Sequence, residues 1–427
     1  MGRRLYTILL RLALPLILLR LWWRGRREPG YRSGVGERFG RYPMRPGRRV
    51  IWVHAVSVGE ARAAAPLVRA LQREFPDSEL LVSCTTAAGR AMVAQVYGDS
   101  VLCAFLPYDL PGPMARFLDH FRPRIGIMME TEVWPNLLAA CGERGTPVIL
   151  ANARLSPKSA RGYARFATLS RPAFGRFAAV CAQDRNAARR LRLLGAANVV
   201  LTGNLKFDVE PDPAKVEEGR AFKVALRGRK ALLLASTREG EEAILLDALG
   251  EDDGSLLIVV PRHPQRFDEV AALLAARGLA FARRSFGEAP HAGRRVYLGD
   301  TMGEMAFYYA TSDVALIGGS FQPLGGQNLI EACAAGAPVV LGPHMYNFAE
   351  ATRHALRAGA ALQARDAGEA MRDALELLAD AERCERMGAA GLRLCAAHRG
   401  ATGRHLKVVC GLLEAPAEDG LRAAAPG

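Results

Sequence analysis

The stretch from Val314 to Phe348 decides the fold, and it reads VALIGGSFQPLGGQNLIEACAAGAPVVLGPHMYNF. Its first four residues, up to Ile317, are apolar and have the length of a buried strand. A loop with two glycine pairs follows, then a short helix predicted to start near Gln327 or Asn328 and to end at Gly336. Pro338 to Gly342 is the next strand. Strand, glycine loop, helix and strand together form one repeat of a parallel α/β sheet.

The physical chemistry of this repeat favours an anionic ligand. Glycines let the backbone approach a ligand closely, and a helix start offers unpaired N–H groups to a phosphate. From Glu331, one turn into the helix, a carboxylate can accept hydrogen bonds from two ribose hydroxyls. The alternative is a plain βαβ turn whose glycines serve packing. The predicted nucleotide-binding residues here are Gly318, Gly319, Ser320, Gly326, Gln327, Asn328 and Glu331. The spacing matches neither a P-loop nor G-x-G-x-x-G, so neither an ATPase nor a dehydrogenase follows.

Alternating strand-like and helical segments continue on both sides of this stretch. Seven strand-like runs are Val50–Val56, Leu80–Thr85, Val101–Leu106, Ile125–Met129, Val148–Ala151, Ala178–Cys181 and Val199–Leu201. Five more are Leu232–Ala235, Leu256–Val260, Val296–Leu298, Val314–Ile317 and Val339–Leu341. Such alternation predicts two doubly wound parallel sheets. Ligands of such sheets bind beyond the carboxyl ends of the strands.

The domain boundaries follow from composition. Pro211 to Gly219 is rich in Pro, Asp, Glu and Lys and predicts a hinge. We therefore expect a membrane anchor over 1–25, an α/β domain over 26–205, a second α/β domain over 206–415 and a frayed tail over 416–427. A chain of 427 residues with 50% hydrophobic side chains can bury two cores of this kind.

The amino-terminal segment is apolar from Leu5 to Trp23 apart from Thr7, Arg11 and Arg20. It is just long enough to span a bilayer, although Arg11 would be costly at mid-membrane. No small-residue cleavage site follows, which disfavours a signal peptide, and a buried core helix would need partners for the flanking arginines. We expect an anchor that spans the membrane or lies in its interface, with the remaining chain in the cytoplasm.

The net charge of +14 and the pI of about 9.8 suit an acidic substrate or an anionic membrane surface. No basic patch interleaved with aromatics, zinc-finger spacing or RNP-like motif is present, so a nucleic-acid partner is not expected. No metal-ligand spacing and no Asp-x-Asp motif occur either, and we expect neither a metal nor another cofactor. The eight cysteines are scattered and predict free thiols.

Three carboxylates follow strands of the first series. Glu60 opens a helix directly after the first strand, where it can take a proton from an attacking hydroxyl; the alternative is a residue that only favours the helix dipole. Glu130 and Glu132 end another strand before Trp134 and Pro135. Two close carboxylates cannot easily both stay ionised, so one is predicted to bind the acceptor and the other to tune a pKa. Glu132 is alternatively a helix cap.

Other polar residues follow strands in both halves. Ser57, Gly59, Ser83, Thr85, Thr86, Asn152, Arg154 and Ser156 are predicted, with Glu132, to bind the acceptor. Lys206, Ser236, Thr237, Arg238, Glu241, Arg262 and His263 are predicted to bind the donor. Arginine suits phosphate and carboxylate because its planar fork gives bidentate hydrogen bonds.

Several of these motifs together resemble one known family. Ser57-Val58-Gly59-Glu60, Glu130-x-Glu132-x-Trp134-Pro135-Asn136, Gly318-Gly319-Ser320, Gly325-Gly326-Gln327-Asn328-x-x-Glu331 and Gly342-Pro343-His344 are similar to motifs of the 3-deoxy-D-manno-octulosonic acid (Kdo) transferases. That family often has His where this chain has Gln327. The resemblance extends from about Glu37 to Phe348.

The resemblance implies a GT-B glycosyltransferase with two Rossmann-like domains facing a cleft. It implies transfer of Kdo from CMP-Kdo to a lipid A precursor at the cytoplasmic face of the inner membrane, with Glu60 as general base. Glu130, which directly follows its strand, is predicted to be a second catalytic residue. Two other classes stay open: another GT-B sugar-nucleotide enzyme, such as a UDP-sugar transferase or epimerase, and a membrane scaffold without turnover.

Overall fold

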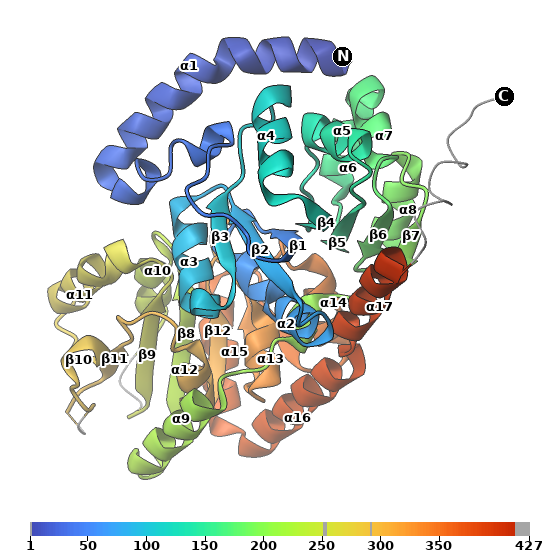
Figure 1. Cartoon of the computed structure of the whole chain (residues 1–427). Helices are drawn as coiled ribbons and strands as arrows, with labels where there is room; N and C mark the ends of the chain where they lie inside the picture. Colours follow the sequence, from blue (N-terminus) through green and yellow to red (C-terminus); the bar gives the residue numbers. More distant parts are fainter. Residues whose placement is uncertain (1, 251–253, 291–292, 415–427) are drawn as a thin grey trace. The chain divides into compact units, whose positions relative to one another are not determined.

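The structure is a computed structural model that describes residues 2–250, 254–290 and 293–414. The chain divides into two compact units (Figure 1). Unit 1 comprises Met1–Val209 together with Arg399–Gly427, and unit 2 comprises Glu210–His398. Each unit is described by itself below.

Unit 1 is built on a parallel sheet of seven strands in the order β3-β2-β1-β4-β5-β6-β7. The strands are β1 Arg49–His54, β2 Ser78–Cys84, β3 Leu102–Phe105, β4 Pro123–Met129, β5 Val148–Ala153, β6 Ala179–Ala182 and β7 Val199–Leu201. Its helices are α1 Arg3–Arg27, α2 Val58–Glu74, α3 Ala87–Tyr97, α4 Pro111–Phe121, α5 Pro135–Glu143, α6 Pro157–Arg165, α7 Ala167–Phe174, α8 Arg185–Leu193 and α17 Ala401–Glu414. All seven predicted strands of the first series are confirmed.

Alternate residues of β1 pack into the two hydrophobic cores of this unit, one on each face of the sheet. Trp52 packs with Phe117 of α4 on one face of the sheet, and Ile51 and Val53 pack with α2 on the other. A strand buried on both faces reads as a continuous apolar run. This is why the sequence pattern located it.

Unit 2 has a second parallel sheet of seven strands, in the order β10-β11-β9-β8-β12-β13-β14. The strands are β8 Ala231–Thr237, β9 Leu256–Pro261, β10 Phe281–Arg283, β11 Val296–Leu298, β12 Val314–Ile317, β13 Val339–Leu341 and β14 Ala361–Gln363. Its helices are α9 Pro213–Ala225, α10 Glu241–Asp247, α11 Phe267–Ala276, α12 Met305–Thr311, α13 Leu329–Ala334, α14 Ala349–Arg357, α15 Ala367–Ala379 and α16 Ala381–His398. The five predicted strands are confirmed, and the edge strands β10 and β14 are additional.

The predicted hinge over Pro211 to Gly219 is wrong. Helix α9 occupies most of that segment, with Pro213 at its first position and Asp212 at its cap, where the carboxylate accepts from the N–H of Ala214. Proline at the first helical position costs no hydrogen bond. The signals interpreted as a break are therefore those of a helix start.

The chain returns to unit 1 after α16. Helix α17 packs against α2 and the 3-10 turn η4, Leu205–Asp208. Asp208 accepts hydrogen bonds from the N–H groups of Gly400 and Thr402 at the start of that helix. The predicted second domain, 206–415, thus begins four residues early and wrongly includes α17. The predicted tail over 416–427 lies outside the described residues.

Helix α1 contains the predicted anchor. Residues Arg3–Arg26 form a helix long and apolar enough to cross a membrane, with a mean hydropathy of 1.8 over an 18-residue window. Figure 1 shows α1 at the outside of unit 1, near α4 and α5. A single helix of this kind near the amino terminus is consistent with an anchor.

Candidate functional site

Strained backbone marks the carboxyl edge of the sheet in unit 1. Glu130 directly follows β4 with φ 56°, and Asn152 near the end of β5 has φ 51°. A left-handed conformation is uncommon for residues other than glycine and gathers at functional sites. The N–H of Arg154 donates to the carbonyl of Glu130 at 3.4 Å, so the two strained segments contact each other.

Glu60 forms a capping box at the start of α2. Its carboxylate accepts hydrogen bonds from the N–H of Val56 at 2.8 Å and from the hydroxyl of Ser57 at 3.2 Å, and Ser57 in turn accepts from the N–H of Glu60. Burial raises the pKa of Glu60 to about 7, and the charge of Glu130 adds to the rise. The carboxyl group can therefore exchange a proton near neutral pH.

Glu130 is buried and held by two cations. Arg154 Nε lies 2.6 Å from one carboxylate oxygen, and Lys206 Nζ lies 2.9 Å from the other. Burial alone would raise the pKa of Glu130, but Lys206 and Arg154 outweigh it and hold the pKa below its ordinary value. Glu130 is thus an ionised carboxylate whose negative charge acts on Glu60.

Lys206 therefore lies in unit 1, on η4, and not with the predicted donor residues of unit 2. Sequence reasoning could not pair it with Glu130, because 76 residues separate the two.

Glu132 accepts a hydrogen bond from the indole N–H of Trp134 at 2.8 Å. Burial raises its pKa, and the charge of Glu130 raises it further. The alternative of Glu132 as a helix cap is wrong. The carboxylate of Asp109 caps α5 instead, accepting from the N–H groups of Asn136 and Leu137.

The predicted acceptor residues fall into two groups. Ser57, Thr86 and Ser156 cap helices α2, α3 and α6 with their hydroxyls, Thr85 is half-buried, and Gly59 is exposed. Ser83 and Asn152 are fully buried. Ser83 contacts the indole of Trp52 and the imidazole of His54, and Asn152 accepts from the N–H of Leu205. Both side chains position their neighbours, and their contact with the acceptor stays a prediction.

Sequence reasoning missed two buried histidines behind the carboxylates. The Nδ1 of His54 lies 2.8 Å from the Ser83 hydroxyl, and burial lowers the pKa of His54 to about 3. His405 of α17 accepts from the N–H of Asn152 through Nε2, and its Nδ1 lies 2.7 Å from the carbonyl of Ala401. Burial lowers the pKa of His405 to about 4, so its ring is neutral. His54 closes the first strand and could have been noticed there; nothing in the sequence signals His405.

In unit 2 the glycine loop after β12 wraps around a carboxylate of its own chain. Glu241 is fully buried at the start of α10 and accepts from the N–H groups of Gly319 at 2.6 Å and Phe321 at 2.9 Å. Its carboxylate also accepts from the backbone N–H groups of Arg238 at 2.8 Å and Gln322 at 3.4 Å. The carboxylate oxygens of Glu241 are occupied by backbone N–H groups of this loop, and contact of Glu241 with the donor stays a prediction.

The backbone of Ser236 lies too close to residue 318 for any side chain there, because a Cβ added to Gly318 would lie 2.5 Å from the carbonyl oxygen of Ser236. Ser320 is also fully buried, donates to the carbonyl of Ile317 and accepts from the N–H of Gly342. Ser320 thus joins the glycine loop to the following Gly-Pro-His turn, and its contact with the donor stays a prediction.

The second glycine pair leads into α13 as predicted. Asn328 caps that helix, accepting from the N–H of Ile330, and its amide donates to a carboxylate oxygen of Glu331 at 3.0 Å. Gly326 has φ 78°, and an added Cβ there would lie 2.2 Å from the sulfur of Met345. Gln327 is half-buried, as are Asn328 and Glu331. These three side chains remain accessible on one turn.

Basic side chains gather where β8 and β9 end. The pKa of His263 is lowered by burial and then by the charges of Arg238 and Arg262, which places the three side chains near one another. Ser236, before them, has φ 58°. The fully buried Thr237 donates to Glu242, which forms a bidentate pair with Arg266. Contact of Thr237 with the donor stays a prediction, and the basic group can meet an anion.

Within the described ranges, no cluster of three or more His, Cys, Asp or Glu side chains could hold a metal ion.

Known proteins are similar to this chain over nearly its whole length. A sequence model described as "3-Deoxy-D-manno-octulosonic-acid transferase (kdotransferase)" matches residues 33–209. A 3-deoxy-D-manno-octulosonic acid transferase of Bordetella pertussis is 48% identical over 95% of this chain and 98% of its own. The chain belongs to the Kdo transferase family. A 3-deoxy-D-manno-octulosonic acid transferase of Haemophilus influenzae is 36% identical over 97% of this chain and 99% of its own.

The family makes the chain a glycosyltransferase, and solved structures agree on the fold. A glycosyltransferase from Rickettsia africae covers 87% of this chain and all of its own, with a TM-score of 0.59 at 12% identity. A UDP-GlcNAc 2-epimerase from Neisseria meningitidis covers 85% of this chain and all of its own, with a TM-score of 0.59 at 16% identity. These likenesses concern the fold alone. The predicted GT-B-like class, with two parallel α/β sheets, is confirmed.

Proposed function

We propose that the enzyme transfers Kdo from CMP-Kdo to a lipid A precursor such as lipid IVA, with the acceptor on unit 1 and the nucleotide on unit 2. Family membership supports Kdo as the transferred sugar. The observation that carries the mechanism is Glu60, a carboxyl group with a pKa of about 7 at the carboxyl edge of the first sheet. A general base works best when its pKa lies near the working pH.

Glu60 as carboxylate takes the proton of an acceptor hydroxyl. The freed oxygen electron pair forms a bond to the anomeric carbon of Kdo, and the bond from that carbon to the CMP phosphate oxygen breaks. CMP leaves with the bonding pair. A single displacement of this kind inverts the anomeric centre.

Glu130 is proposed to act through Glu60. Its charge, fixed by Arg154 and Lys206, disfavours a second negative charge nearby and so raises the proton affinity of Glu60. Arg154 is partly exposed and can also meet an acidic acceptor. Glu132 is left to orient the acceptor beside Trp134.

On unit 2, Arg262 is proposed to bind the nucleotide phosphate and Arg238 the sugar carboxylate or phosphate. Their mutual proximity with His263 supports this, because fixed cations stabilise the charge that develops on a leaving phosphate. Glu331 is proposed to accept from the ribose hydroxyls, with Asn328 orienting it. We expect no metal and no other cofactor.

The site of action is proposed to be the cytoplasmic face of the inner membrane. The apolar helix α1 and the net charge of +14 support an enzyme held at an anionic surface.

Mass spectrometry of the product tests the proposal. Wild-type enzyme with CMP-Kdo and lipid IVA should give an acceptor heavier by whole Kdo units, while Glu60→Gln should give almost none. A UDP-sugar used in place of CMP-Kdo serves as the control donor. Turnover with that donor and none with CMP-Kdo would disprove the proposed donor.

A further inference from the structure

Helix α1 is fastened to unit 1 at both ends. Near its start, Thr7 is buried and shares hydrogen bonds of 3.0–3.1 Å with the side chain of Asn136 on α5. Near its end, the guanidinium of Arg24 lies 4.4 Å from the ring centre of Tyr31. A helix of 25 residues is about 37 Å long. Contacts at both ends hold that length along the surface of the unit.

The outer face of α1 is an apolar stripe. Its members recur every three or four residues: Leu5, Ile8, Leu9, Leu12, Leu16, Leu19, Trp22 and Trp23. Leu12 is 72% exposed and Leu16 is 70% exposed, so the stripe lacks a protein cover among the described residues. Exposed apolar side chains interspersed with arginines suit the membrane interface, where the long arginine side chains can reach the headgroups. Arg11 then avoids the mid-membrane position that would be costly.

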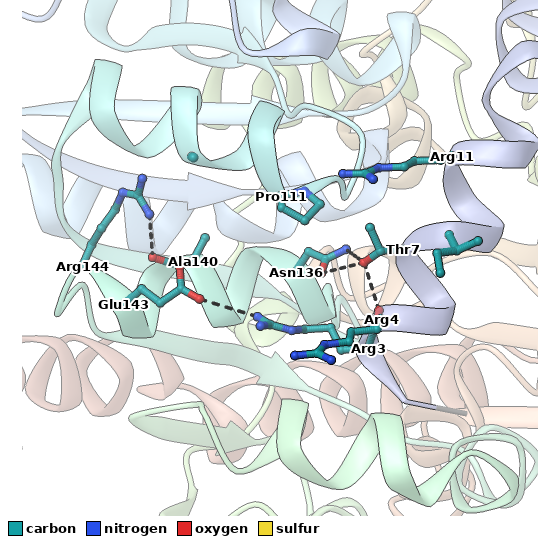
Figure 2. A pocket seen from close by; sticks show the side chains of 11 residues that line it. Arg3, Arg4, Thr7, Arg11, Pro111, Asn136, Ala140, Glu143 and Arg144 are labelled. Atoms are coloured by element: carbon teal, nitrogen blue, oxygen red, sulfur yellow. Dashed lines mark hydrogen bonds and ion pairs between the residues drawn. The ribbon is translucent and has the colours of Figure 1, made fainter.

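A pocket of about 520 Å³ opens beside this stripe, between α1 and helices α4 and α5 (Figure 2). Ile8 belongs to the stripe and also lines the pocket. Figure 2 shows Arg11 reaching toward Pro111 on one side of Thr7, with Arg3 and Arg4 on the other. The pocket therefore adjoins the apolar stripe.

The pocket carries an excess of positive charge. Arg3, Arg4, Arg11 and Arg144 line it, with Glu143 as the one acidic lining residue. Glu143 lies 3.8 Å from Arg3, and Arg144 pairs with Asp119 at 2.8 Å. Within the described part of the chain, Arg4 and Arg11 have no acidic partner. Two guanidinium groups are thus available to an anion.

We propose that this pocket binds the phosphate of an anionic membrane-lipid headgroup. Guanidinium groups pair with phosphate through two parallel hydrogen bonds, and anionic lipids gather basic side chains at the cytoplasmic leaflet. The lipid is a component of the surrounding membrane and is not consumed by the reaction. The site goes beyond sugar transfer and does not depend on which acceptor is used.

The test compares two single changes on the same helix. Arg11→Gln removes a pocket cation, and Arg20→Gln removes an exposed cation of α1 that does not line the pocket. The full chain is mixed with phosphatidylcholine vesicles with or without phosphatidylglycerol, and bound protein is measured by flotation. Arg20→Gln should weaken binding to the anionic vesicles about five-fold, as loss of any single charge does. Arg11→Gln should weaken it roughly ten- to hundred-fold, the range for hydrogen bonds to a charged group.

Binding to pure phosphatidylcholine should be unchanged in both variants, because the apolar stripe carries it. Arg4→Gln serves as a second pocket variant, and thermal melting in detergent checks that each variant is folded. Equal losses for Arg11→Gln and Arg20→Gln would overturn the proposal and leave a diffuse basic surface. A rise in melting temperature with inorganic phosphate, without any preference for anionic vesicles, would assign the pocket to free phosphate and overturn the lipid.

Discussion

The imidazole of His405 accepts a hydrogen bond from the backbone N–H of Asn152, with 2.9 Å between the two nitrogens. The residues are 253 positions apart. Asn152 in turn accepts from the N–H of Leu205, and the next residue, Lys206, pairs with Glu130. A neutral histidine on the last helix thereby supports the strained backbone next to the proposed catalytic carboxylates.

Replacing His405 by alanine should therefore lower both stability and turnover. The N–H of Asn152 would be left buried without an acceptor, at a cost of about 1–3 kcal/mol of unfolding free energy. His405→Gln keeps an acceptor and should recover part of both losses. Denaturant unfolding and kcat measure the two effects. Lys407→Ala, on the exposed face of the same helix, is the control; an equal loss there would refute a specific role for His405.

Glu60→Gln should reduce turnover by roughly two or more orders of magnitude, the scale of general-base loss. CMP binding should not change. In the wild type, the pKa of about 7 means that the carboxylate form predominates only above neutrality. The rate should thus fall about ten-fold per pH unit below that value. A wild-type rate that is flat from pH 5 to 8 would remove Glu60 as the base.

Glu130→Gln should move the acid limb of the pH–rate profile to lower pH. The substitution removes a negative charge that raises the pKa of Glu60 and leaves the cations Lys206 and Arg154, which lower it. Glu132→Gln should cause a smaller shift in the same direction. The exposed Glu143→Gln on α5 should cause none. An unmoved limb in Glu130→Gln would mean that Glu130 does not tune Glu60.

Glu331→Ala should weaken CMP binding by about 1.5–3 kcal/mol, the range for hydrogen bonds to a charged group. Calorimetric titration with 2′,3′-dideoxy-CMP provides the matched control, because that nucleotide has no ribose hydroxyls to lose. Parallel losses for both nucleotides would instead indicate that Glu331 only supports the helix start with Asn328.

Glu241→Gln should loosen the glycine loop of unit 2. The new NH₂ group would face backbone N–H donors of Gly319 or Phe321, so about 1–3 kcal/mol of stability should be lost. CMP should also bind more weakly, because the loop that Glu241 holds is predicted to contact the nucleotide. Glu239→Gln, whose side chain is 57% exposed, is the control. If Glu241→Gln is destabilised but binds CMP with unchanged affinity, the glycine loop does not contribute to the nucleotide site.

Sequence reasoning located twelve strands because buried parallel strands are continuous apolar runs. It missed β10 and β14, each three residues long at a sheet edge, where the apolar run is too short to stand out. It read Pro211 to Gly219 as a hinge because proline and aspartate signal a helix start as well as a break.

The site was predictable where function depends on local order and not where it depends on distant contacts. Glu60, Ser57 and Val56 interact within five residues, and the sequence placed them together. One partner of Glu130, Lys206, is 76 residues away, and one partner of Asn152, His405, is 253 away. A sequence likewise does not show that the folded chain buries the side chains of Glu241, Ser320 and Thr237.

The return of the chain to unit 1 has a consequence for biosynthesis. A ribosome makes Asn152 long before His405; at about 5–20 residues per second, the interval is roughly 13–50 seconds. During that time the segment that carries the carboxylates has no partner for its buried N–H. A nascent chain released at Val209 would contain Glu60, Glu130 and Lys206 but not the helix that supports them. The buried N–H of Asn152 thus gains its acceptor only when helix α17 has left the ribosome.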